Sequence, residues 1–315
     1  MLTSPLCELL GIDYPVFQGG MAWVADAELA AAVSNAGGLG IIGAGNAPAD
    51  VVQAQIRAAA TLTNKPFGVN VMLMSPYARE VAEMVADEPV AVVTTGAGQP
   101  GPYMKRWQEA GLRVIPVVPS TAIARRMESI GASAVIAEGG ESGGHVGDLT
   151  TMALVPQVCD AVSIPVVAAG GIADGRGVAA AFMLGAVGVQ LGTRFLVARE
   201  CHVHPTYKAK VLAAGDIDTI ATGRRLGHPV RSLKTPFSRR FAAMEYDPGV
   251  SNEDLDTLGE GALRAAVVDG DEQDGCFLAG QAAGLVTAEQ SAAEIVTELV
   301  TQAEARLREA ARWVA

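Results

Sequence analysis

Short apolar runs recur every twenty to thirty residues or so along the first two thirds of the chain. Eight of them are rich in Val, Ile and Ala and are predicted to be strands: 15–18, 39–42, 67–71, 91–94, 113–117, 134–137, 166–169 and 188–191. Ala-rich stretches of helical length lie between them, for example 27–36, 50–62, 77–86, 120–130 and 176–184. Near-continuous apolar strands that alternate with helices indicate a parallel sheet covered on both faces. Eight such units predict an α/β fold, a (β/α)8 TIM barrel, with a doubly wound open sheet as the main alternative.

The alternation of strands and helices stops after Arg194. Residues 195–260 contain no clear strand, and we expect them to form an excursion of helices and loops that lines the mouth of the active site. Residues 261–315 are expected to be C-terminal helices that pack on the barrel. The predicted organisation is therefore a barrel over 1–194 followed by these two segments.

Composition and charge narrow the class of protein. Half of the 315 residues are apolar and 5% are aromatic, so aliphatic side chains must fill a large core. The net charge of −11 argues against nucleic-acid binding, which needs a basic surface. The four cysteines form no C-x-x-C pair, and the pair His202 and His204 lacks a third ligand, so we expect no metal site. With no evident signal peptide or membrane span, we expect a cytoplasmic protein.

Small residues follow the last two predicted strands. Gly170 and Gly171 come after the seventh strand, and Gly192 and Thr193 come after the eighth. In TIM barrels the loops after strands 7 and 8 frequently bind a phosphate. Glycine lacks a Cβ, so main-chain amides can approach phosphate oxygens closely, and a helix amino terminus adds favourable dipole charge. We therefore predict that a phosphorylated cofactor or substrate binds these turns.

The ends of the other strands carry amides, small residues and main chain instead of lysine or several carboxylates. Gln18, Gly19, Gly20 and Met21 follow the first strand, and Asn70 lies at the end of the third. An aldolase or isomerase barrel would usually place a lysine or carboxylates here. This face suits a large, flat cofactor that carries the difficult chemistry itself, and flavin mononucleotide (FMN) matches the predicted phosphate position. The two amides would hydrogen-bond its ring; a structural hydrogen bond is the alternative for each.

A glycine-rich loop over residues 138–147 follows the sixth predicted strand and contains Glu138 and His145. A histidine at the active-site face can donate a proton or orient a substrate, because it titrates near neutral pH. The alternative is a loop histidine that stabilises a turn. Its position after a barrel strand favours the functional interpretation.

A basic segment stands out against the acidic background. Its members lie between Asp218 and Glu245 and are Arg224, Arg225, Arg231, Lys234, Arg239 and Arg240. Positive charge at the mouth of a cleft would attract dinucleotide phosphates or an acidic carrier protein. The alternative is ion pairing with the acidic stretch 245–274.

Several motifs, taken in order, resemble a known family. They are FQGGMAWV at 17–24, GGLG at 37–40, PFGVN at 66–70, GGH at 143–145 and AAGGIADG at 168–175. This set resembles the FMN-dependent 2-nitropropane dioxygenase-like (nitronate monooxygenase) barrels, and among them the flavin-dependent enoyl-acyl-carrier-protein reductases of the FabK type. Further matching motifs at 93–98, 192–195, 227–231 and 279–285 extend the resemblance over nearly the whole chain.

The resemblance implies an oxidoreductase of fatty acid biosynthesis. NADH or NADPH would reduce FMN, which in turn would reduce a trans-2-enoyl thioester carried by acyl carrier protein or CoA. The resemblance implies that His145 donates a proton or polarises the thioester carbonyl, and that Glu138 supports the ring or a bound monovalent cation. The predicted cofactor-binding residues are Gln18, Gly19, Gly20, Met21, Asn70, Glu138, Gly170, Gly171, Gly192 and Thr193. For its assembly we consider a homodimer.

Two other functions are weighed against the reductase. A nitronate monooxygenase would use the same barrel and the same FMN, with oxygen as the oxidant. A barrel of the inosine-monophosphate dehydrogenase type is disfavoured, because that chemistry needs a nucleophilic cysteine after the sixth strand and residues 138–151 contain none.

Overall fold

Eight parallel strands close into a barrel in a computed structural model that describes residues 2–314. Their order around the barrel is β1, β2, β3, β4, β5, β6, β8 and β9. The bounds are β1 Val16–Gln18, β2 Leu39–Gly43, β3 Phe67–Met72, β4 Val92–Gly96, β5 Arg113–Val118, β6 Val135–Glu138, β8 Val166–Ala169 and β9 Gly188–Leu191. Residue Val16 of β1 pairs with Val189 of β9, which closes the ring. The predicted (β/α)8 barrel is confirmed.

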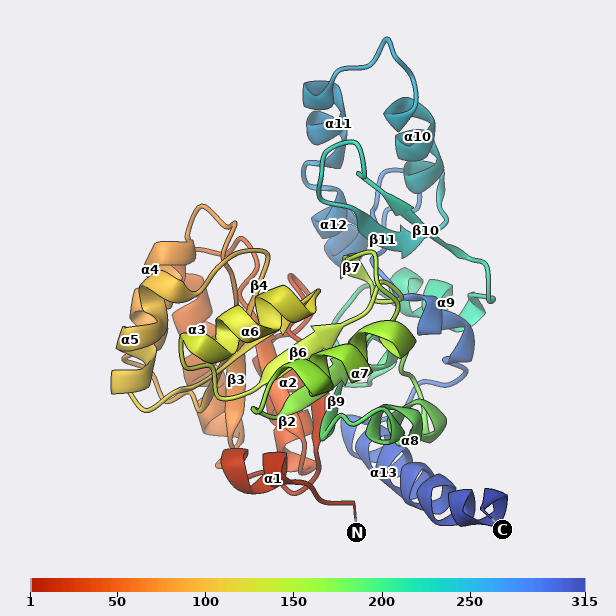
Figure 1. Cartoon of the computed structure of the whole chain (residues 1–315). Coiled ribbons are helices and arrows are strands. Elements are labelled where there is room, and N and C mark those ends of the chain that lie inside the picture. The colour runs from red at the N-terminus through yellow and green to blue at the C-terminus, as the bar shows by residue number, and fades with distance from the viewer. Residues whose placement is uncertain (1, 315) are drawn as a thin grey trace.

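Helices cover the outside of the barrel (Figure 1). They are α2 Ala27–Asn35, α3 Ala49–Leu62, α4 Ala78–Val85, α5 Gly101–Glu109, α6 Thr121–Ser129, α7 Thr151–Ala161 and α8 Gly175–Met183, with the short α1 Pro5–Leu10 at the amino-terminal end. The C-terminal helix α13, Ala292–Glu309, packs against α8 and α2. It therefore takes the place of the helix that would follow β9, where the chain forms only the short 3-10 helix Thr193–Val197.

Apolar burial explains these elements. The barrel interior contains fully buried side chains such as Phe17, Ile41 and Ile115. Helix α2 begins at its N-cap Asp26, whose carboxylate accepts a hydrogen bond from a main-chain amide of the first turn. It lies so close to β2 that a Cβ on Gly40 would be 1.8 Å from the carbonyl oxygen of Ala30.

A second layer stands above the carboxyl ends of the strands (Figure 1). It contains a three-stranded sheet in the order β10, β11, β7, formed by Thr219–Thr222, Val230–Leu233 and Gly144–His145. Its helices are α10 Pro236–Glu245, α11 Asn252–Gly259 and α12 Ala262–Arg264. Phe237, Phe241 and Leu255 form a small separate core there. Helix α9, Pro205–Ala213, instead packs against the 3-10 helices Thr193–Val197 and Gln281–Leu285. The expectation that 195–260 lacks strands was wrong, because two four-residue strands are too short to show an apolar pattern.

Within residues 2–314, no helix combines the length and the apolar character that a membrane span requires.

Candidate active site

The loop after β6 is held in place by a strand from the upper layer. β7 and β11 pair antiparallel, with Val230 opposite His145 and Arg231 opposite Gly144. The Arg231 guanidinium donates from Nε and Nη2 to the carbonyl oxygen of Gly140, at 3.1 and 3.0 Å. Segments about ninety residues apart thus build one structure over the barrel mouth. A guanidinium that donates twice to one carbonyl fixes the loop geometry more firmly than a single bond would.

His145 lies at the edge of this small sheet. Its imidazole keeps access to solvent, and the rings of His145 and His228 are 6.3 Å apart between centroids. Partial burial lowers the pKa of His145, and the positive charge of His228 lowers it further. The pKa of His145 therefore lies below that of a free imidazole, so fewer molecules carry its proton at neutral pH.

Glu138 is the last residue of β6 and is half-buried. Burial raises its pKa to about 7. The Ser142 hydroxyl opposes this rise, although it forms no hydrogen bond of ordinary geometry with the residues described. The carboxyl group is therefore partly protonated near neutral pH and can act as a hydrogen-bond donor.

Glu141 connects the same loop to helix α7 and to the turn after β8. Its carboxylate accepts from the main-chain amide of Thr151 at 2.9 Å, and the Thr151 hydroxyl lies 3.0 Å from it. The same hydroxyl lies 3.0 Å from the carbonyl oxygen of Gly170. A Cβ on Gly171 would lie 3.4 Å from the Cβ of Glu141. The loop with His145 and the predicted phosphate turn are therefore neighbours.

Both glycines of the turn after β8 have backbone conformations that favour glycine. Gly170 has φ +97° and Gly171 has φ +72°, and a Cβ on Gly170 would be 2.8 Å from the carbonyl oxygen of Gly139. In the next turn, the Thr193 hydroxyl accepts a hydrogen bond of 2.9 Å from a main-chain amide of the C-terminal segment. β8 and β9 are adjacent in the barrel, so these two turns lie side by side.

The turn after β1 reaches the same region. A Cβ on Gly192 would lie 3.5 Å from the sulfur of Met21. A Cβ on Gly20 would lie 2.3 Å from the Cβ of Asn70, so only glycine permits this approach of β1 to β3. The structure thus brings the turns after β1, β3, β8 and β9 to one face of the barrel, as the strand order requires.

The two amides predicted to contact a ring differ in their hydrogen bonding. Asn70 accepts a hydrogen bond of 3.0 Å from the buried Thr94 hydroxyl, and its NH2 group makes no hydrogen bond with the residues described. Gln18 is fully buried; its NH2 donates to the carbonyls of Gly19 and Ile41, and its oxygen accepts from the Ile41 amide at 3.2 Å. A ring contact from Gln18 would require these bonds to break. The free NH2 of Asn70 is available to a ligand.

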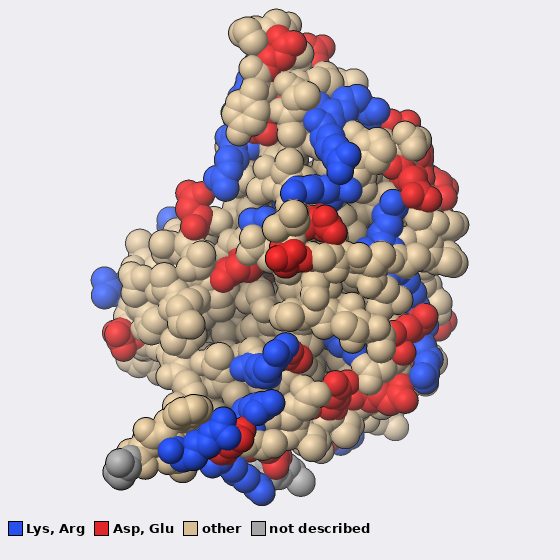
Figure 2. Space-filling view, turned by 90° about the vertical axis from the view of Figure 1, so that its right-hand side faces the viewer, with Lys and Arg blue, Asp and Glu red and all other residues tan. Residues whose placement is uncertain are grey.

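The basic segment is only partly paired. Arg240 pairs with Asp274 at 2.5 Å, within the acidic stretch that we considered as the alternative partner. Arg224 pairs instead with Asp148 of the loop after β6, at 3.1 Å. Lys234 and Arg239 are exposed and make no ion pair with any residue between 2 and 314. On the face shown in Figure 2, basic and acidic side chains lie next to each other in the upper part of the molecule.

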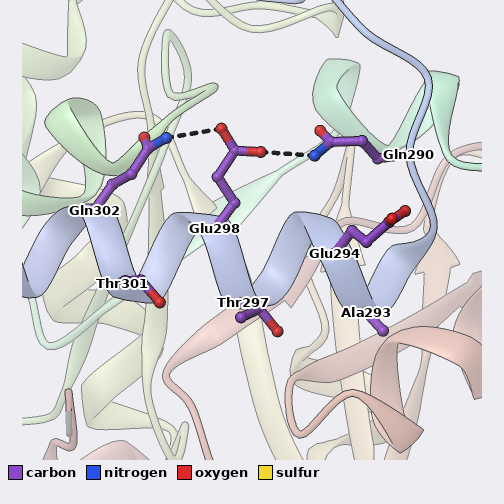
Figure 3. A pocket seen from close by; sticks show the side chains of 7 residues that line it. All are labelled: Gln290, Ala293, Glu294, Thr297, Glu298, Thr301 and Gln302. Carbon is purple, nitrogen blue, oxygen red and sulfur yellow. Dashed lines mark hydrogen bonds between the residues drawn. The ribbon is translucent and has the colours of Figure 1, made fainter.

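A buried cation next to the predicted phosphate turn was not recognised from sequence. Arg194 is 7% exposed, and this burial lowers the pKa of its guanidinium. The guanidinium donates to the carbonyl oxygen of Ala288 at 3.2 Å and to the side chain of Gln290. Gln290 donates in turn to Glu298 of α13 at 2.9 Å. Gln290 and Glu298 border a groove of about 580 Å³ along α13 (Figure 3), which is a separate feature from the barrel mouth. Arg194 therefore anchors the turn to the C-terminal helix.

Among residues 2–314, no group of three or more His, Cys, Asp or Glu side chains is arranged to hold a metal ion.

Comparisons with known proteins agree on the family. The sequence profile of the family "Nitronate monooxygenase" matches residues 3–88 and 74–302. The solved structure of FabK from Thermotoga maritima is 46% identical, with a TM-score of 0.97 and full coverage of both chains. A (3aS,4S,5R,7aS)-5-hydroxy-7a-methyl-1-oxo-octahydro-1H-indene-4-carboxyl-CoA dehydrogenase of Mycobacterium tuberculosis is 36% identical, covering 99% of each chain.

A probable nitronate monooxygenase of Staphylococcus saprophyticus is 33% identical, covering 96% of this chain and 98% of its own. These relatives carry different activities on one scaffold, so they establish an oxidoreductase family and not a substrate. The chain belongs to the nitronate monooxygenase family.

Proposed function

We propose that this protein is an FMN-dependent oxidoreductase that reduces trans-2-enoyl thioesters with NADH or NADPH. The observation that carries the proposal is the contact between two segments at the barrel mouth, the loop after β6 and the turn after β8. The loop with His145 contacts the turn of Gly170 and Gly171 through Glu141 and Thr151. The loop with the predicted proton donor thus lies beside the predicted phosphate turn. The 46% identity to FabK over the full chain supports a reductase.

The residues at this face fit FMN. The glycines at 170, 171 and 192 have no Cβ, so their main-chain amides could approach phosphate oxygens closely, and Thr193 would add a hydroxyl group. The free NH2 of Asn70 would donate to the polar edge of the ring, and Gly19, Gly20 and Met21 would border it. FMN, when bound there, would supply the transfer of hydride from the nicotinamide to the β-carbon of the enoyl thioester.

His145 would complete the reduction by giving its proton to the α-carbon of the substrate, or by polarising the thioester carbonyl during that step. Its access to solvent allows the proton to be replaced after each turnover. Glu138 would support the bound ring, since a partly protonated carboxyl group can donate a hydrogen bond without placing a full negative charge beside it.

The thioester would be carried by acyl carrier protein or by CoA. The name of the Mycobacterium tuberculosis relative includes a carboxyl-CoA substrate, which supports a thioester on CoA. The exposed Lys234 and Arg239 would favour either anionic carrier.

Nitronate monooxygenase activity is the second candidate, favoured by the matched family profile and by the Staphylococcus saprophyticus relative. The deciding assay compares crotonyl-thioester-dependent oxidation of NADH and NADPH with nitronate-dependent uptake of oxygen by the same flavin-loaded protein. Turnover of the thioester without nitronate oxidation is the expected result. Nitronate oxidation alone would refute the reductase, and a protein that binds no FMN would refute both functions.

A further inference from the structure

His228 lies beside His145 although the two residues are 83 positions apart in the sequence. It precedes β11 by two residues, and the pairing of β11 with β7 sets Val230 opposite His145. The two imidazoles are 6.3 Å apart between centroids and inclined by 59°. His228 is half-buried, and its side chain makes no hydrogen bond or ion pair with the residues described. Within residues 2–314, no polar side-chain contact therefore fixes this ring beside His145.

We propose that His228 is a positioning residue for the reaction at His145: the two imidazoles form an electrostatically coupled pair in which the charge of His228 controls whether His145 holds a proton. Its use in the reduction of a thioester rests on the function proposed above, whereas the coupling itself does not.

The physical basis is repulsion between like charges. Two cations about 6 Å apart at a protein surface repel each other measurably, so protonation of one ring opposes protonation of the other. A charge on one ring therefore makes protonation of the other ring less favourable. The direction agrees with the depressed pKa of His145, to which His228 contributes after burial.

Other charged side chains surround this pair. Those on the elements packed here are Glu138, Glu141 and Asp148 of the loop after β6, and Arg224 and Arg231 beside β11. Arg224 is paired with Asp148, and Arg231 donates to a carbonyl of the loop. Among the residues described, His228 is the charged group that contributes to the shift of the His145 pKa. This makes His228 the position where a change of charge should act on His145 most directly.

Two substitutions of opposite character test the coupling. His228→Gln removes the titrating charge and keeps a polar side chain, whereas His228→Arg makes the charge permanent. We expect the titration midpoint of His145 to move to higher pH in His228→Gln and to lower pH in His228→Arg. The matched control is His202→Gln. His202 is exposed, and its imidazole pairs with Asp26 and Glu28 instead of lying beside His145. The control variant should leave the midpoint of His145 unchanged.

The direct measurement is NMR titration of the flavin-loaded protein with isotope-labelled histidine, of which the chain contains four. Assignment of His145 comes from the signal lost in His145→Ala. The second measurement is the pH dependence of the oxidative half-reaction with crotonyl-CoA. Its alkaline limb should follow the His145 midpoint in the same direction in each variant, because a proton donor loses activity as it deprotonates.

Equal His145 midpoints in the wild type and both His228 variants would overturn the proposal. If the variants fail to fold, the wild-type titration decides. A coupled pair gives a His145 curve that departs from single-site behaviour, and a simple single-site curve refutes the coupling. Absence of enoyl reduction in the wild type would instead refute the proposed function, while the NMR titration still reports on the pair.

Discussion

Replacement of Glu138 by Gln should make the protein more stable at alkaline pH. The carboxyl group at the end of β6 has its pKa raised by burial to about 7, from an ordinary value of 4.5. The folded protein therefore holds this proton more tightly than the unfolded chain does. Stability contributed by the protonated group is complete below pH 4.5 and is lost as pH rises towards and through 7. Gln is neutral at every pH and has nearly the same shape, so it removes this loss.

The magnitude follows from the difference between the two pKa values. About 2.5 pKa units correspond to about 3 kcal/mol of unfolding free energy once the group is fully ionised in both states. At pH 5 most of this loss has not yet developed. The stability advantage of Glu138→Gln over the wild type should therefore grow by about 2 to 3 kcal/mol between pH 5 and pH 8.

Urea denaturation of both proteins at pH 5 and pH 8, without added flavin, measures this change. Glu80→Gln on α4 is the matched control, because Glu80 is exposed and its replacement should change the unfolding free energy by less than about 0.5 kcal/mol. If the unfolding free energies of Glu138→Gln and the wild type differ by the same amount at both pH values, the reasoning is refuted. It would mean that the carboxyl group reaches water freely when the barrel is folded.

Three further substitutions test other parts of the site and fold. Gly171→Val should bind less flavin, because φ at this position is +72° and the side chain would press on Glu141. The absorbance spectrum of the purified variant measures its flavin content, and stoichiometric flavin would contradict the phosphate assignment. His145→Ala should slow the oxidative half-reaction in stopped-flow while FMN stays bound, and unchanged turnover removes His145 from the mechanism. Gly40→Ala should destabilise the barrel by about 1 to 3 kcal/mol in thermal denaturation, because its Cβ would overlap the Ala30 carbonyl oxygen; an unaltered melting temperature would contradict the close packing of α2 on β2.

The barrel was predictable because its strands are buried on both faces. Each strand is then a nearly unbroken apolar run, and such a run can be recognised in the sequence without knowing which strands pair with it. The predicted range 166–169 coincides with β8, and 113–117 lacks only the last residue of β5. The turns after these strands were also predictable, since a closed barrel brings the ends of all its strands to one face.

The upper layer was not predictable in the same way. β10 and β11 have four residues each and β7 has two, so their pairing depends on partners far away in the chain. The position of His228 beside His145 and the bonds from Arg231 to the loop follow from that pairing alone. The hydrogen bonds that engage Gln18 were equally hidden, because a buried structural amide and a ligand-binding amide look alike in sequence.

Two different parts of the fold build the proposed site, one for the flavin and one for the proton donor. The flavin side of the proposed site is made of main chain and glycine at strand ends, where close approaches such as Gly20 to Asn70 leave little freedom for change. The side with His145 is made by the small sheet of β7, β10 and β11, which is separate from the sheet of the barrel. A change there alters the charge around His145 without disturbing the barrel. Differences in substrate among relatives of this chain should therefore arise mainly from the sheet and its flanking residues, with His228 as the position that acts most directly on the proton.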